Sequence, residues 1–570
     1  DFRGRLSGSN EEKELAQQIA GLFKKWKLTP IISNGKSQSF IQSFEIITGT
    51  KLSGTNNFFL NNKPLLSEKE YRPLSLSQSG SFKSEAMSFV GYGIKAPATD
   101  KFATYDSYEK VDIKNKWAVM FKDLPSKIDK NYRNHLLPFA RLAHKITLAQ
   151  KLGAHGVIFI DSTDLSTKAY LSKMKYEGAP TNLPVIEITL EKFLSAFNLT
   201  ESQYTKIKET LESNQPLESL GETCFAKGEI NLQLDKKMAS QIIGMIPAAK
   251  TADRKLKSII IGAHMDHLGQ GEIGNSLATT QEQSTIHFGA DDNASGDTGV
   301  LELAHYFSAH RNKLKRNIYF ALWSAEEMGV LGSHYFTEDW EKTKNRKINQ
   351  DFWFALNMDM IGRFKDKLYI QGVGSSKGWT HIIEPIAVKN QIPISIQYDP
   401  YLPTDSISFY LKEIPAINFF TGVHSDYHTP RDTADKINFD GLAGIINLVK
   451  DFTEQTLITP EKEITYEKVE GSSKIKEGGR SFRIYLGTIP DYSQEGVKGV
   501  RISGVSKNSP AEKAGLQAKD IIVEFNGQPV DSINDYVFGL QTAVPKKEIA
   551  IKIMRANELV TLKITPELKQ

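Results

Sequence analysis

The sequence predicts an α/β protein whose main domain has a mixed, mostly parallel central sheet flanked by helices. From about residue 227 to 462, buried-looking apolar strands alternate with helical stretches such as residues 297–310. Strands that are apolar on both faces are typical of parallel sheets covered by helices. The rest of the chain contains shorter β-like runs, which predict smaller β-rich domains beside the main one.

The first element is a helix over residues 10–27. Its apolar residues recur at helical spacing and share one face: Leu15, Ile19, Leu22, Phe23 and Trp26. An alternating strand candidate follows at 39–47. The composition then shifts to Gly, Thr, Ser and Asn, which predicts a domain boundary near residue 51.

Residues 52–226 are predicted to form an inserted domain. They contain short β-like runs at 87–94, 116–124 and 156–160, and one strong helix at 144–154. This section has no dense cluster of catalytic residue types, so chemistry is expected elsewhere.

The main domain is predicted to combine residues 1–51 with 227–462. Its strands are the apolar runs at 258–264, 317–324, 352–359 and 416–422. A charged linker follows, and residues 463–570 are predicted to hold this linker and a small β domain with one helix.

Composition excludes several classes of protein. With 71 Lys and Arg against 67 Asp and Glu, the net charge is +4, and no basic stripe indicates nucleic-acid binding. Cys224 is the only cysteine, which excludes an internal disulfide framework and a Cys-based zinc finger. No run approaches the roughly 18 apolar residues that a membrane span requires.

Residues of the types that bind metal stand where the predicted strands end. They are His264 and Asp266 after the first strand, Asp291 and Asp292 before the next helix, Glu326 and Glu327 after the second strand, Asp359 after the third, and His424, Asp426 and His428 after the fourth. Ligands in open α/β sheets bind outside the carboxyl ends of the strands. Together these clusters predict one site.

The residue types suit hydrolysis with two metal ions. Zinc binds imidazole and carboxylate, and a catalytic site leaves a position open for water. Two ions about 3.5–4 Å apart also need a carboxylate that can bridge them. Asp266, two residues after His264, suits a carboxylate that holds a ligand imidazole in one tautomer.

An alternative for the glutamate pair is helix capping. Ser324 and Glu327 have the spacing of a capping box, and acidic groups in a first turn suit the helix dipole. The two interpretations are compatible, because a helix that begins there would aim both carboxylates into the cleft.

Five motifs, in this order, resemble the bacterial di-zinc aminopeptidases, a family that includes glutamate carboxypeptidase II. They are "GAHMDHLG", "GADDNASG", "SAEEMGVLGS", "NMDMIGR" and "SDYHTPRDTADKIN". The resemblance implies a zinc-peptidase fold that binds two zinc ions. One zinc would be held by His264 and Asp359, the other by Glu327 and His428, with Asp292 bridging both.

The resemblance also implies a reaction. Metal-bound hydroxide would attack the first peptide carbonyl, with Glu326 as general base and Tyr427 as oxyanion donor. Asp291 is expected to support Asp292 rather than bind metal, and the peptide bond after Asp292 is expected to be cis. The protein is therefore expected to be an aminopeptidase acting on peptides.

One departure concerns the wall of the substrate pocket. Family members often have "SDH" where this chain has Thr404-Asp405-Ser406, so this wall is expected to differ. Asp405 is a candidate for contacting a substrate amine, and a solvated loop acid is the alternative.

The flanking segments resemble family modules as well. "GRLSGS" with the first helix is similar to the usual family start, and the middle section resembles a protease-associated domain. Residues 496–530 resemble a bacterial PDZ domain, with "KGVRISGV" (498–505) as its carboxylate-binding loop and strand. Such domains capture a peptide C-terminus; a packed module with an occluded groove is the alternative. The protein is expected to be exported to the periplasm or cell surface of a bacterium.

Other functions remain open from the sequence. The same metal centre could serve a dipeptidase or carboxypeptidase, and a similar fold serves glutaminyl cyclases with one zinc. "GSSKG" at 374–378 matches a serine hydrolase elbow around Ser376. A binding protein that has lost its metals is a further alternative, although every ligand position is filled here.

Overall fold

The computed structural model describes residues 2–568 apart from short gaps. The gaps are residues 35–36, 99–101, 126–127, 129, 137–138, 141, 162–180, 214, 216, 218–219, 221–222, 254, 273–274, 279–281, 283, 470–483, 491–497, 506–508, 531–535, 537–538, 541–542, 544–545 and 557. The chain forms two compact units: residues 1–46 with 237–471 and 479–570, and a second built around residues 47–236.

The first unit contains the predicted mixed sheet. Its strands, in spatial order, are β1 (Thr29–Pro30), β15 (Leu232–Ile246), β17 (Ile318–Trp323), β16 (Ser258–His264), β18 (Phe352–Met358), β21 (Ala416–Phe420), β19 (Leu368–Gln371) and β20 (Ile394–Ile396), while β4 (Ile41–Leu52) also pairs with β15. β17, β16, β18 and β21 are mutually parallel. β15 and β19 are antiparallel to their inner neighbours, β17 and β21. The predicted fold class is confirmed, and the parallel strands end at the same edge.

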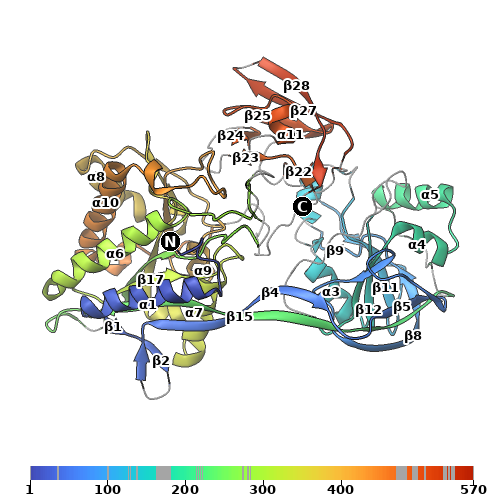
Figure 1. Cartoon of the computed structure of the whole chain (residues 1–570), viewed down its shortest axis with the longest axis horizontal. Helices are drawn as coiled ribbons and strands as arrows, with labels where there is room; N and C mark the ends of the chain where they lie inside the picture. Colours follow the sequence, from blue (N-terminus) through green and yellow to red (C-terminus); the bar gives the residue numbers. More distant parts are fainter. Residues whose placement is uncertain are drawn as a thin grey trace. The chain divides into compact units, whose positions relative to one another are not determined.

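Helices cover both faces of this sheet (Figure 1). One layer contains α1 (Asn10–Lys25), α6 (Ala294–Ala309), α8 (Trp379–Lys389) and α10 (Phe439–Ile458); α7 (Leu331–Lys344) and α9 (Ser406–Tyr410) cover the other face. Because side chains alternate along a strand, Ile259 and Ile261 of β16 join the first core and Ile260 joins the second. This two-sided burial explains the continuous apolar run of β16.

The second unit has its own sheet. Its order is β6 (Lys63–Pro64), β5 (Asn57–Leu60), β14 (Phe225–Ile230), β8 (Gly80–Phe89), β11 (Trp117–Phe121), β12 (Gly156–Ile160), β13 (Val185–Ile188) and β7 (Tyr71–Pro73). Its helices are α2 (Lys130–Leu136), α3 (Leu142–Lys151), α4 (Leu190–Ala196) and α5 (Glu201–Glu212). A short pair of strands, β9 (Lys95–Ala96) with β10 (Tyr105–Asp106), also belongs to this unit, and another, β2 (Ile32–Asn34) with β3 (Ser37–Ser39), belongs to the first unit. The predicted strands and the helix of this section are present.

The boundaries between the two units fall inside strands. The sequence predicts them at residues 51 and 227, whereas the compact units divide at 46/47 and 236/237. These positions lie within β4 and β15, which pair with each other. No turn marks either boundary, because both strands continue through it.

The C-terminal region is an antiparallel β domain with its own apolar core. Its elements are β22 (Ile484–Tyr485), β23 (Thr488–Pro490), β24 (Val500–Val505), α11 (Pro510–Lys513), β25 (Ile521–Phe525), β26 (Gln528–Pro529), β27 (Ile549–Arg555), β28 (Glu558–Ile564) and β29 (Glu567–Leu568). The sequence-based choice of residues 498–505 as peptide-binding strand is wrong, because β24 lies between β23 and β25. In the described part of this sheet, β23 is the terminal strand at that end.

No helix within the described stretches combines the length and apolar character needed to cross a membrane.

Candidate metal centre

The residues at the strand ends converge at the carboxyl edge of the sheet. His264 is the last residue of β16, Asp359 directly follows β18, and Asp292 lies just before α6. His264 Nε2 is 3.3 Å from Asp292 Oδ1 and 3.5 Å from Asp359 Oδ1. One donor atom from each residue lies within 4.8 Å of the others, so these three side chains could hold one metal ion.

A second group of ligands meets the other oxygen of Asp292. His428 Nε2 is 3.3 Å from Asp292 Oδ2 and 3.1 Å from Glu327 Oε2. The two oxygens of one buried carboxylate therefore face two different imidazoles, as a bridging carboxylate requires. The structure thus brings together all five predicted ligands.

His267 also belongs to this region. Its Nδ1 is 2.8 Å from Glu327 Oε1 and 3.9 Å from Asp292 Oδ2. Donor atoms of His267, Asp292 and Glu327 lie close enough to one another to hold a metal ion, so His267 adds to the second group of ligands. The second His of "HMDH", three residues after His264, was the feature of the sequence that could have indicated this position.

Asp266 supports the site in a different way from the one predicted. The partner of His264 Nδ1 is the backbone carbonyl of Asp266, at 3.1 Å, and the carboxylate is 3.9 Å away. The carboxylate instead accepts the backbone N–H of Glu326 at 3.1 Å and the hydroxyl of Ser7 at 2.8 Å. It therefore orients the loop of the glutamate pair.

Asp291 faces the backbone and His424. It accepts the N–H of Gly362 at 2.6 Å and lies 3.1 Å from His424 Nε2. Asp432, which the sequence did not single out, accepts the N–H groups of both Asp291 and Asp292 at 2.9 and 3.0 Å. The peptide bond between Asp292 and Asn293 is cis, as the resemblance implies.

Ser324 does not cap a helix. Helix α7 begins only at Leu331, and its N-cap residue Val330 makes no side-chain cap. The Ser324 hydroxyl instead donates to the buried Glu12 carboxylate. The capping alternative is wrong, and the loop between β17 and α7 is free to present Glu326 and Glu327 to the site.

The two adjacent glutamates have opposite electrostatic environments. Burial raises the pKa of Glu326 well above its usual range, and the nearby carboxylates of Asp359 and Asp405 raise it further against the effect of His264. Glu327 is also buried, but His428 and its hydrogen bonds outweigh burial and lower its pKa to about 2. The carboxyl groups of the two glutamates therefore differ in how readily they bind a proton.

Tyr427 lies beside the second ligand group. Its ring stacks on His428 with centroids 3.8 Å apart and an angle of 22° between the rings. This contact places Tyr427 next to the site, and its role as oxyanion donor stays a prediction.

Asp405 is buried, with 1 % of its surface exposed, so the solvated-loop alternative is wrong. It lies with Gly262, Trp323 and Asn357 at a small internal cavity. Burial raises the pKa of Asp405 to about 8, against the opposing effects of His264 and Ser333. A contact with a substrate amine would require its covering side chains to move, and that role stays a prediction.

Ser376 is poorly placed for nucleophilic catalysis. It is 2 % exposed, and its hydroxyl oxygen accepts the N–H of Gly378 at 3.3 Å. A buried hydroxyl that closes a local turn cannot reach a substrate, which disfavours the serine hydrolase alternative.

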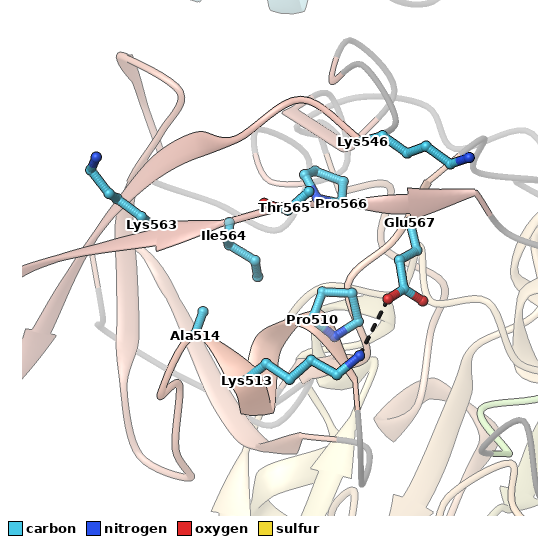
Figure 2. Close-up of a pocket in the computed structure, with 9 residues that line it drawn as sticks. All are labelled: Pro510, Lys513, Ala514, Lys546, Lys563, Ile564, Thr565, Pro566 and Glu567. Atoms are coloured by element: carbon cyan, nitrogen blue, oxygen red, sulfur yellow. Dashed lines mark hydrogen bonds and ion pairs between the residues drawn. The ribbon is translucent and has the colours of Figure 1, made fainter.

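A separate pocket of about 740 Å³ lies in the C-terminal β domain (Figure 2). It lies beside α11 and the β28–β29 segment, and Lys513 Nζ is 3.4 Å from Glu567 in its wall. Its nine lining residues comprise aliphatic side chains, prolines, a threonine, three lysines and one glutamate. They include no set of metal ligands.

Two parts of the chain match known protein families. Residues 241–453 match the model of Peptidase family M28, and residues 501–555 match the PDZ domain. Leucine aminopeptidase 2 of Trichophyton equinum is 28% identical over 174 residues, 29% of this chain and 30% of that protein. The serine endoprotease DegS of Haemophilus influenzae is 31% identical over 94 residues, 16% of this chain and 28% of that protein. The chain thus spans less than a third of these relatives' length.

Two solved structures align with most of the chain. The aminopeptidase from Aneurinibacillus sp. strain AM-1 has a TM-score of 0.48 at 20% identity, covering 82% of this chain and 94% of that one. BSAP, a zinc aminopeptidase from Bacillus subtilis, has a TM-score of 0.42 at 18% identity, covering 82% and 95%.

The residues that match the Peptidase family M28 model lie in the α/β domain and include both groups of side chains that could hold a metal ion. The α/β domain is a domain of Peptidase family M28, and the C-terminal β domain is a PDZ domain.

Proposed function

We propose that this protein is a di-zinc aminopeptidase that removes N-terminal residues from peptides. The observation that supports this most directly is Asp292, whose two oxygens each lie 3.3 Å from a different imidazole, that of His264 and that of His428. Asp359 lies beside His264 on one side of Asp292, and Glu327 lies beside His428 on the other.

The residues present fit zinc. Two imidazoles and three carboxylates are the ligand types that zinc binds in catalytic sites. All five side chains are buried or nearly so, and their donor atoms meet within ligand-to-ligand distances. Zinc bound there would supply Lewis acidity, polarising a peptide carbonyl and acidifying water.

Glu326 is the residue placed to move a proton. Its Oε2 lies 4.0 Å from His264 Nε2, at the edge of the first ligand group, and it belongs to neither group. Asp266 fixes its backbone, so the carboxylate can accept a proton from water and deliver it to the leaving amine. The phenol of Tyr427, stacked on His428, would donate to the developing oxyanion.

Similarity to leucine aminopeptidase 2 favours action at the N-terminus of a peptide. A substrate panel of amino-acid anilides, free dipeptides, N-blocked peptides and C-terminally blocked peptides tests this. Hydrolysis of the anilides and the C-blocked peptides, with N-blocked peptides left intact, is expected. Cleavage of N-blocked peptides at their free C-terminus would identify a carboxypeptidase, and cleavage of dipeptides alone a dipeptidase.

We further propose that the PDZ domain binds a peptide C-terminus along β23, the terminal strand of its described sheet. Export to a bacterial periplasm or cell surface is part of the same proposal. Fractionation of the native host tests it.

A further inference from the structure

His267 points one ring nitrogen at the second ligand group. The residue is fully buried, and its Nδ1 lies 2.8 Å from Glu327 Oε1 and 3.9 Å from Asp292 Oδ2. Its Nε2 has no hydrogen-bond partner among the described residues, so the recorded polar contacts of the ring pass through Nδ1.

The position of this imidazole is fixed by the N-terminal segment and by a glycine. The backbone N–H of His267 donates to the Arg5 carbonyl at 3.1 Å, and Leu6 forms a parallel bridge to His267. Gly289 packs on the ring so closely that a Cβ there would lie 2.5 Å from Cδ2 of His267. The ring is therefore oriented by the protein itself.

His267 and His428 contact different carboxylate oxygens of Glu327. Their nitrogens lie 2.8 Å from Oε1 and 3.1 Å from Oε2, and the two rings are 5.9 Å apart at 73°. Ligands bound to one zinc at about 2.0–2.1 Å in a tetrahedron lie roughly 3.3 Å from each other. The distances around Asp292, Glu327 and the two imidazoles, 2.8–3.9 Å, bracket this value.

We propose that His267 is a further protein ligand at the second metal position, together with Asp292, Glu327 and His428. This inference rests on the proposed di-zinc function. It makes the two positions unequal, with four protein ligands at the second and three at the first. Since a catalytic zinc keeps an open coordination position, the first position, beside Glu326, is the one left for water.

The test compares His267→Gln with His287→Gln in the full-length chain. His287 is a matched control because it is equally buried and its ring lies 6.5 Å from that of His267. Its nitrogens contact Ser276 Oγ and the Thr285 carbonyl rather than the carboxylates. Zinc content and affinity are measured after equilibrium dialysis against buffered zinc.

Wild type and the control should bind two zinc ions, while His267→Gln should weaken one site by more than about 100-fold, beyond the 10–100-fold usual for a residue that only orients a ligand. Unchanged affinity in His267→Gln would overturn the inference and leave the proposed function intact. A wild-type chain that binds no zinc would instead overturn the proposed function.

A crystal structure of the zinc-loaded wild type decides the matter if His267→Gln fails to fold. An ion about 2.0–2.1 Å from Nδ1 supports the proposal. An ion beyond 3 Å, with Nδ1 only hydrogen-bonded to Glu327, overturns it, because such a distance is outside the ~2.0–2.1 Å range of a zinc–nitrogen bond.

Discussion

Glu326→Gln is the substitution that most sharply tests the proposed division of labour between the adjacent glutamates. Gln keeps the shape of Glu326, and the backbone N–H that Asp266 holds at 3.1 Å is unaffected. Glu326 belongs to neither ligand group, so both metal positions retain their ligands. The substitution therefore removes a proton acceptor and nothing else from the site.

The expected loss follows from that single change. A general acid–base group contributes roughly 10²–10⁴-fold to the rate, so kcat should fall by that factor, or about 3–5 kcal/mol of transition-state stabilisation. KM should change little, because the substrate meets the same metals and pocket. Burial raises the pKa of Glu326, so the neutral amide should leave Tm unchanged or higher.

The assay is the kinetics of an amino-acid anilide, with zinc content and Tm measured on the same samples. Two zinc ions retained with kcat reduced at least 100-fold would support the assignment. A kcat within tenfold of wild type at full zinc content would refute it, because another group would then be moving the proton. Loss of zinc would refute it as well, because Glu326 would then be a ligand.

Three further outcomes are expected. Glu327→Gln should lose zinc from one site and recover partly in excess zinc; equal behaviour of the two glutamate variants would contradict their separate roles. Removal of residues 470–570 should leave anilide hydrolysis largely intact, since the ligands precede residue 470 and the PDZ domain has its own core; inactivity of a folded truncated chain would contradict this. Burial raises the pKa of Glu12 from 4.5 to about 8, so the folded state binds this proton more tightly and stability falls as pH rises across that interval. Glu12→Gln should flatten the decline of Tm between pH 5 and 9, and an unchanged slope would show that Glu12 does not cause it.

The sheet and the five ligands could be predicted because both depend on local patterns. A strand buried on two faces is a continuous apolar run, as in Ser258–His264, and parallel strands end at one edge. His264, Glu327 and Asp359 stand at such ends, so their convergence follows once the strands are recognised. The resemblance of the five motifs to the di-zinc aminopeptidases then supplied the pairing of these ligands.

Burial and strand neighbours were harder to predict. Asp405 stands in a polar stretch of sequence, yet Trp323 of β17 and Asn357 of β18 line the same cavity. Likewise, β24 alternates like an edge strand, and only its pairing with both β23 and β25 shows that no edge is free. Both facts depend on contacts between segments far apart in the chain.

The N-terminal segment shows why such contacts matter for the chemistry. Ser7 donates to the carboxylate of Asp266, and Asp266 in turn holds the backbone of Glu326. Arg5 donates to the carbonyls of Met265, Phe288 and Gly289, which ties the loop after β16 to the loop before α6. Residues about 260–320 positions away in the sequence thus hold the loop of Glu326, the proposed general base, and the loops that bear His264 and Asp292. A hydroxyl and a guanidinium in a short polar segment have no periodicity to reveal this, so their contribution becomes visible only when the chain is folded.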